Sequence, residues 1–204
     1  MSIEKYFLPF PEIVSERVLL RRCEVSDAEE FFELAKNPEL TVNLSWDYHK
    51  SINETRGFIQ QLQEEYEKER CKTWAICERS ENRFIGMITL RTANFQLRGE
   101  VGYWIGVPYW NKGYMSEALA ALLDFCFGVL ELNRVQAEHF VCNPASGRVM
   151  EKCGMSYEGT LRGYIFCGEE WHDCRMFSVL RSEWENRLSE CFRDDCDGCG
   201  LLDN

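Results

Sequence analysis

The sequence predicts an α+β fold built on one mixed sheet. Two helical stretches are followed by a meander of strands and then by alternating helices and strands, an order that favours a single sheet with helices on its faces. The chain has 204 residues, of which 45% are hydrophobic and 28% charged, as in an ordinary globular protein. This length suits one domain with a substantial core. We expect that domain over residues 1–188 and an acidic, cysteine-containing tail over residues 189–204.

The first half alternates apolar and polar residues in its strands and returns apolar residues at helical spacing in its helices. Ser26 and Asp27 are typical N-cap residues, so a helix is expected to follow them. A Ser-Glu-Asn turn separates the two strands of a hairpin. In chain order we expect a strand over 15–23, a helix after Asp27, a helix over 51–70, and strands over 73–77 and 83–90.

The second half begins with a strand that leads through a turn into a long amphipathic helix. Its last two strands flank a Cys-Gly-Glu-Glu turn and predict a terminal hairpin. In chain order we expect a strand over 100–106, a helix over 113–130, a strand over 134–141, a helix over 145–153, and strands over 157–166 and 171–180.

The turn before the long helix contains Pro108 and Gly113. The first N–H groups of a helix have no partner within the helix, and they lie at the positive end of its dipole. A helix that begins near Gly113 can therefore hold a pyrophosphate, and a glycine lets the backbone approach such a ligand closely. A purely structural helix start gives the same pattern and stays open as the alternative.

Two signatures carry a family resemblance. The first is WNKGYM at residues 110–115, followed by Glu117 and an alanine, and the second combines Asn143 and Ser146 with Arg-Val and Glu-Lys-Cys-Gly over residues 148–154. With these motifs the chain resembles the GNAT superfamily of N-acetyltransferases. It is most similar to the RimJ/RimL-like branch, which acetylates the N-termini of ribosomal proteins.

The resemblance extends over residues 13–186, with two departures from the superfamily pattern. Trp110 stands where Gln or Arg is usual, although Trp is familiar in the RimJ/RimL-like branch. Met115 stands where Gly or Ala is usual, which makes the end of the loop bulkier.

The resemblance implies an acyl-CoA N-acyltransferase fold: a central mixed, mostly antiparallel sheet, flanked by helices, with two strands splayed apart to admit pantetheine. It implies acetyl-CoA as co-substrate, with a backbone N–H near the end of one splayed strand polarising the thioester carbonyl. Asn143 would hold the pantetheine arm, and it also suits a helix start before Pro144. The cofactor-binding residues implied are Ile105, Val107, Trp110, Asn111, Lys112, Gly113, Tyr114, Met115, Asn143 and Ser146.

Acetyl transfer to an amine needs a proton acceptor, and the resemblance directs attention to Glu100 at the start of a splayed strand. A solvent-facing edge residue is the alternative for Glu100, and water or His49 can share the role. Trp46 and His49 lie in a loop that shapes the acceptor pocket in the resembled family, so we expect them to bind substrate.

Ser146 is the candidate proton donor for the departing thiolate. Many members of the superfamily carry a Tyr one helical turn further on, where this chain has Val149 and Met150. A helix-capping role is the alternative for Ser146. A route through an acetylated Cys142 or Cys153 needs a neighbouring base, and neither has a histidine beside it in sequence. We therefore expect direct transfer in a ternary complex.

The net charge of −11 disfavours nucleic acid as a partner and favours a cationic acceptor. An α-amine has a reference pKa of about 7.7–8.0, against about 10.4 for lysine, so it is more readily neutral at pH 7. The preferred acceptor is the α-amine of a protein N-terminus, as in ribosomal proteins. Polyamines, aminoglycosides and other small amines remain alternatives, and so does an acyl-CoA-binding module without catalysis.

The chain contains 11 cysteines, an odd number that does not predict a disulfide scaffold. Cys77, Cys126 and Cys142 lie in apolar stretches and are expected in the core. Cys191, Cys196 and Cys199 have partial zinc-like spacing, but we expect no metal because a fourth ligand is not evident. Without a signal peptide or a membrane-length apolar run, the expected location is cytoplasmic. A homodimer is one alternative for the oligomeric state.

Overall fold

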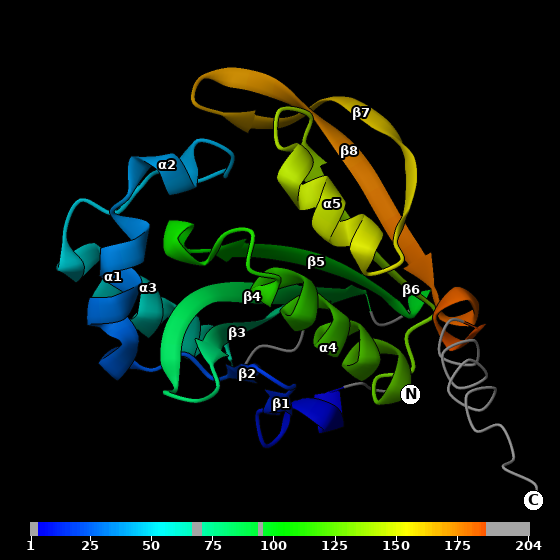
Figure 1. Cartoon of the computed structure of the whole chain (residues 1–204), viewed down its shortest axis with the longest axis horizontal. Coiled ribbons are helices and arrows are strands. Elements are labelled where there is room, and N and C mark those ends of the chain that lie inside the picture. The colour runs from blue at the N-terminus through cyan, green and yellow to red at the C-terminus, as the bar shows by residue number, and fades with distance from the viewer. Residues whose placement is uncertain (1–3, 67–70, 94–95, 187–204) are drawn as a thin grey trace, which may run out of the picture.

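The computed structural model describes residues 4–66, 71–93 and 96–186. It contains an eight-stranded sheet in the order β1-β2-β3-β4-β5-β6-β8-β7, with helices packed on it (Figure 1). The predicted α+β class with a mixed, mostly antiparallel sheet is confirmed. The strands are β1 Ile13–Val14, β2 Val18–Arg21, β3 Cys71–Glu78, β4 Arg83–Ala93, β5 Arg98–Ile105, β6 Arg134–Phe140, β7 Ser156–Cys167 and β8 Glu170–Leu180. The helices are α1 Ala28–Ala35, α2 Pro38–Thr41, α3 Ile52–Glu65, α4 Tyr114–Gly128 and α5 Pro144–Lys152, with short 3-10 helices at Glu4–Phe7, Val25–Asp27 and Val107–Tyr109.

Strand β3 is buried on both of its faces and separates two hydrophobic cores. Trp74 and Ile76 point into the core under α4, whereas Ala75 and Cys77 point into the core under α1 and α3. Successive side chains of a strand alternate between faces, so a continuous apolar run gives a strand with helices on both sides.

Helices α4 and α5 lie on the same side of the sheet, α4 over the first strands and α5 over β6 and β8 (Figure 1). Met150 of α5 belongs to the same core as Leu119 and Leu122 of α4. Gly147 lets α5 approach β6 closely, because a Cβ there would lie 2.8 Å from Nε2 of His139. The opposite face of the sheet carries α1 and α3 over its first half.

Several element boundaries differ from the sequence-based expectation. The strand expected over residues 15–23 is the shorter β2, Val18–Arg21. The two-residue strand β1 lies before the expected range and is joined to β2 by a turn in which Ser15 N–H donates to the Val18 carbonyl. The helix expected over 51–70 ends at Glu65, and residues 67–70 lie outside the described part. The terminal hairpin is confirmed, with Cys167 opposite Glu170 around a tight turn.

The placement of Cys142 in the core is wrong. Strand β6 ends at Phe140, and the chain then turns toward α5, so that Cys142 is exposed. Cys77 and Cys126 are buried as expected, and burial raises the pKa of the Cys77 thiol to about 12. The tail over residues 189–204, with Cys191, Cys196 and Cys199, lies outside the described residues.

Among the helices that can be described, none combines the length and apolar character needed to cross a bilayer. The described residues also contain no cluster of three or more side chains suited to a metal ion.

Candidate active site

Strands β5 and β6 run parallel and separate soon after they begin. They pair only over Arg98, Gly99 and Glu100 opposite Arg134, Val135 and Gln136. Strand β5 stays paired with β4 as far as Ile105, so beyond Glu100 its other edge has no neighbour among the described strands. This is the splay that the family resemblance implies.

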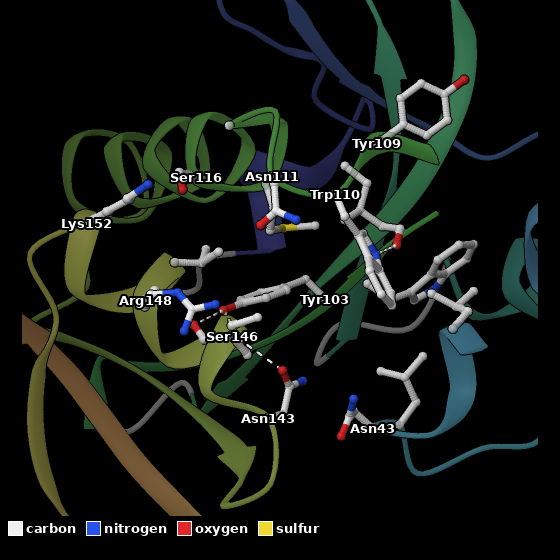
Figure 2. Close-up of a pocket in the computed structure, with 18 residues that line it drawn as sticks. Asn43, Tyr103, Tyr109, Trp110, Asn111, Ser116, Asn143, Ser146, Arg148 and Lys152 are labelled. Atoms are coloured by element: carbon white, nitrogen blue, oxygen red, sulfur yellow. Dashed lines mark hydrogen bonds between the residues drawn. The ribbon is translucent and has the colours of Figure 1, made fainter. Parts of the chain in front are cut away.

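A cavity of about 370 Å³ lies where this splay meets the N-terminal ends of α4 and α5. Figure 2 shows Asn111 and Trp110 on one side of it and Asn143, Ser146 and Arg148 on another. Its walls come from β5, the loop before α4, the first turn of α4, one side of α5 along its length, and the segment around α2: Leu40, Asn43, Leu44, Tyr103, Trp104, Ile105, Tyr109, Trp110, Asn111, Gly113, Met115, Ser116, Asn143, Ala145, Ser146, Arg148, Val149 and Lys152.

Gly113 is the N-cap of α4 and has a left-handed backbone with φ of +83°. The first hydrogen bond of the helix is donated by Glu117 N–H to the Gly113 carbonyl, at 3.0 Å. The N–H groups of the preceding three residues therefore have no acceptor within the helix, which suits an anion. Asn111 also has a positive φ, of 58°, a conformation that asparagine tolerates better than most residues.

Glu117 fixes the start of α4 to the turn between β1 and β2. Its carboxylate accepts hydrogen bonds from Ser15 Oγ at 2.7 Å, from Arg17 N–H at 2.6 Å and from Arg17 Nε at 2.8 Å. Burial alone would raise the pKa of Glu117, but these hydrogen bonds outweigh it and hold the pKa below its ordinary value. Arg17 also donates to the Lys112 carbonyl at 3.2 Å, so one cation braces the loop. This role of Arg17 has no local sequence signal, because its partners lie far along the chain.

Asn143 is the N-cap of α5, and its side-chain oxygen accepts the Ser146 N–H at 3.3 Å. Ser146 is therefore not the cap, and the capping alternative does not describe its hydroxyl. That hydroxyl lies 2.9 Å from the hydroxyl of Tyr103, which also donates to the Ser146 carbonyl at 3.1 Å.

Tyr103 is a cavity residue that was not among those expected from the sequence. Burial raises the pKa of its phenol, and the hydrogen bond with Ser146 offsets only part of that rise. Tyr103 is thus a neutral hydroxyl at pH 7. Its one proton goes either to the Ser146 carbonyl or to the Ser146 hydroxyl, and the two hydroxyls form a hydrogen-bonded pair at the cavity.

Ile105 ends β5 beside the cavity. The Gly106 N–H donates to the Ile85 carbonyl at 2.9 Å, so by the alternation of an antiparallel ladder the Ile105 N–H points away from β4. The Ile105 carbonyl accepts the indole N–H of Trp110 at 2.7 Å, which holds the loop against the strand. A fixed N–H directed toward the splay is the kind of donor that stabilises a developing oxyanion.

Three of the ten expected cofactor-binding residues do not line the cavity with their side chains. Val107 lies in a 3-10 helix, and the Lys112 ammonium lies 5.7 Å from the centre of the Tyr109 ring. Tyr114 donates its hydroxyl to Glu78 and stacks under Arg17. The part of these three residues in cofactor binding stays a prediction.

Arg148 and Lys152 add two exposed cations from α5 to the rim of the cavity. In a chain with a net charge of −11 this local positive charge is notable, since it suits phosphate groups. From the sequence, Arg148 was expected only as part of a signature.

Glu100 is the last residue of β5 that pairs with β6, where it lies opposite Gln136. One carboxylate oxygen lies 3.7 Å from Arg91 Nη1, and the other accepts the Gln136 amide at 3.3 Å. Because Val101 points into the core under α4, Glu100 lies on the other face of the sheet. The base role of Glu100 stays a prediction.

Trp46 and His49 belong to an aromatic cluster on that other face. The Trp46 ring lies 5.7 Å from that of Trp104, which lines the cavity. His49 stacks on Phe31 at 5.4 Å and its Nδ1 lies 2.7 Å from Thr55 Oγ1. Burial lowers the pKa of His49, which favours the neutral ring at pH 7. The ring of Trp104 thus lies between Trp46 and the cavity, whereas His49 contacts Phe31 and Thr55 within the cluster.

Cys142 and Cys153 lie near the start and the end of α5. The Cys142 thiol donates to Asn43 Oδ1 at 3.5 Å, and the buried Cys153 thiol donates to the Ser116 carbonyl at 3.2 Å. Neither contact supplies a base, so the geometry gives no support to an acetyl-cysteine route.

The comparisons with known proteins all point to the same family. Residues 17–156 match the family model described as Acetyltransferase (GNAT) domain. The chain is 31% identical over 173 residues to the N-acetyltransferase YoaA of Bacillus subtilis, an alignment that covers 84% of this chain and 98% of the relative. It is 22% identical over 175 residues to a spermidine N(1)-acetyltransferase of Vibrio cholerae, covering 85% of this chain and 99% of the relative.

Among solved structures, RimL, a ribosomal alpha-N-protein acetyltransferase in complex with coenzyme A, matches with a TM-score of 0.74. The match covers 83% of this chain and 98% of that chain at 24% identity, a level that shows a shared fold.

Proposed function

The chain belongs to the GNAT acetyltransferases, enzymes that use acetyl-CoA as co-substrate, and on this premise we propose that it acetylates the α-amine of a protein N-terminus. The proposed acceptors are basic N-termini such as those of ribosomal proteins. The proposed reaction is direct attack of the amine on the thioester in a ternary complex, in the cytoplasm.

The observation that carries the proposal is the cavity that joins three features. It contains the first turn of α4, suited to a pyrophosphate, and the free edge of β5, suited to a pantetheine arm. It also contains the Tyr103–Ser146 hydroxyl pair beside the N-terminus of α5. In that order, these three features match the pyrophosphate, the pantetheine arm and the sulfur of an extended acyl-CoA.

Each chemical task has a candidate group in this chain. The Ile105 N–H would stabilise the oxyanion as the amine attacks. Ser146, hydrogen-bonded to Tyr103, would give a proton to the departing thiolate. A carboxylate on the acceptor side would accept the proton of the amine, and Glu100 is the candidate that the sequence provides.

Charge and the relatives support this acceptor class. A net charge of −11 attracts cationic peptides, and an α-amine with a reference pKa of about 7.7–8.0 needs less help to become neutral than a lysine does. RimL is a ribosomal alpha-N-protein acetyltransferase, which supports a peptide N-terminus.

A small cationic amine is the second candidate acceptor. The similarity to a spermidine N(1)-acetyltransferase favours it, and the same negative charge would attract a polyamine. The aromatic rings of Trp46 and Trp104 could also receive a cation at close range.

Steady-state acetyl-CoA turnover on matched acceptors tests the proposal. Basic peptides with a free N-terminus should be turned over with a much higher kcat/KM than the same peptides with a blocked N-terminus or than spermidine. Turnover of spermidine with failure of every peptide would replace the peptide acceptor by a small amine.

A further inference from the structure

Glu138 is a second acidic residue at the splay, and nothing in the family signatures points to it. It lies on β6 beyond Gln136, the last residue of that strand that pairs with β5. Its neighbour Ala137 belongs to the core under α4, and His139 packs against Gly147 of α5. Since side chains alternate along a strand, Glu138 lies on the opposite face, the same face as Glu100.

The position across from Glu138 is open. Extending the register of β5 and β6 places Gly102 opposite Glu138, and Gly102 has no side chain to fill the space. Among the described residues, the one atom within 4 Å of a Cβ at Gly102 would be Arg91 Nη1, at 3.9 Å. The Glu138 carboxyl therefore faces the place where the two strands part, from the side away from α4 and α5.

One oxygen of Glu138 has no partner in the described part of the chain. This Oε2 atom is buried and accepts no hydrogen bond from the described residues. A buried acceptor without a donor is unfavourable, and a bound water, ligand or substrate can supply the missing group. Glu100, in contrast, has a partner for each oxygen, Arg91 and Gln136.

Charged and titratable groups surround Glu138 from every neighbouring strand: Glu100 on β5, Arg91 on β4, Tyr164 on β7 and Cys174 on β8. Burial raises the pKa of Glu138 to about 6, the charge of Glu100 adds to the rise, and Arg91 opposes it. A carboxylate with a pKa near 6 is still mostly ionised at pH 7 and is a stronger base than an ordinary glutamate.

We propose that Glu138 is the catalytic proton acceptor, and that with Glu100 it forms the anionic end of the acceptor site, where a primary ammonium group binds. This assignment rests on the proposed acetyl transfer and replaces Glu100 as the base. Glu100, fixed by Arg91 and Gln136, adds negative charge that holds the ammonium beside Glu138.

The proton balance of the step is simple. Glu138 takes one proton from the bound ammonium, directly or through one water, and the neutral amine attacks the thioester carbon. A C–N bond forms, the C–S bond breaks, and the electron pair leaves on sulfur. The second proton of the nitrogen neutralises the thiolate by way of the Ser146 hydroxyl, and Glu138 releases its proton to solvent.

Turnover of Glu138→Gln, Glu138→Asp, Glu100→Gln and wild type, at pH 7 and pH 9, tests the assignment. We expect Glu138→Gln to lose ~10²–10⁴-fold in kcat/KM at pH 7, more than Glu100→Gln loses. The loss should shrink at pH 9, where an α-amine is already neutral, and Glu138→Asp should recover part of the rate. Glu170→Gln, an exposed change on β8, is the matched control and should behave as wild type.

Thermal stabilisation by acetyl-CoA should be the same in all these variants, which shows that the cofactor end is intact. Full activity of Glu138→Gln, or a loss equal at both pH values, would overturn the assignment. The acceptor is whichever amine wild type acetylates best, so that a failure of peptides alone alters the acceptor class. A small amine with a pKa near the value of about 10.4 for lysine is still protonated at pH 9, so for such an acceptor the loss at pH 7 and its partial recovery in Glu138→Asp carry the test. Carbon-13 NMR of the Glu138 carboxyl gives a second readout without any acceptor, and titration at the ordinary glutamate value would also overturn it.

Discussion

Gly113 combines an unusual backbone angle with a place at the cavity. Its φ of +83° is strained for any L side chain, and the helix N-terminus that it opens lines the cavity. We expect Gly113→Val to abolish most of the thermal stabilisation by acetyl-CoA, which for wild type is about 2.7 kcal/mol at a hundredfold excess over Kd.

The control for Gly113→Val is Gly168→Val, in the turn of the terminal hairpin. Gly168 also has a positive φ, of 58°, and no described atom lies within 4 Å of the position that a Cβ would take there. It therefore carries the backbone strain without the ligand contact. Gly168→Val should lower the Tm of the free protein and leave the shift intact. An undiminished shift in Gly113→Val would remove the loop from the binding site.

Ser146 and Tyr103 form a pair of hydroxyl groups at the cavity, with 2.9 Å between their oxygen atoms. A thiolate leaves without full protonation, so Ser146→Ala and Tyr103→Phe should each reduce kcat by less than the ~10²-fold lower bound typical of acid–base groups. Pre-steady-state kinetics would check that the chemical step is affected. A larger loss in Ser146→Ala than in Glu138→Gln would make protonation of sulfur the dominant requirement.

At the scale of the elements, two helical glycines should respond oppositely to alanine. Gly57 lies on the exposed side of α3 with no described atom within 4 Å of a Cβ, so Gly57→Ala should stabilise the protein by about 0.5–1 kcal/mol. A Cβ at Gly147 of α5 would lie 2.8 Å from His139 Nε2, so Gly147→Ala should destabilise it. Urea unfolding with an unchanged m-value checks both signs, and stabilisation by both would contradict the packing of α5 on β6.

Elements whose ends have local signals are the ones best predicted from the sequence. Gly113 before α4 and Asn143-Pro144 before α5 each mark a helix start, and the helices begin there. The break between β1 and β2 has no such signal, because Glu117, far along the chain, holds the turn at Ser15 and Arg17. The apolar run through Cys142 resembles one buried strand, but the turn into α5 ends it sooner.

The residues of the candidate site are likewise predictable from the sequence only where a local motif marks them. The loop before α4, Asn143 and Ser146 stand in recognisable motifs, and they line the cavity. Tyr103 and Glu138 could not be found from the sequence, because their chemistry depends on partners across strands. The Tyr103 hydroxyl meets α5 only in the folded chain, and the raised pKa of Glu138 depends on burial and on Glu100 in the neighbouring strand.

At the scale of the whole molecule, the net charge of −11 should influence substrate capture. Attraction between exposed charges is screened over about 8–10 Å at physiological ionic strength. We therefore expect kcat/KM for a basic peptide to fall as salt increases while kcat changes little. An uncharged peptide is the control, and an equal salt dependence for both peptides would mean that the net charge does not attract the acceptor.

Whether the enzyme acetylates the α-amine of a protein N-terminus is tested most directly by locating the transferred acetyl group. A basic peptide with a free N-terminus and several internal lysines is incubated with the enzyme and acetyl-CoA at pH 7, and tandem mass spectrometry locates the modification. We predict acetylation of the α-amine with the lysines unmodified. Acetyl groups on lysine side chains and an unmodified N-terminus would contradict the claim.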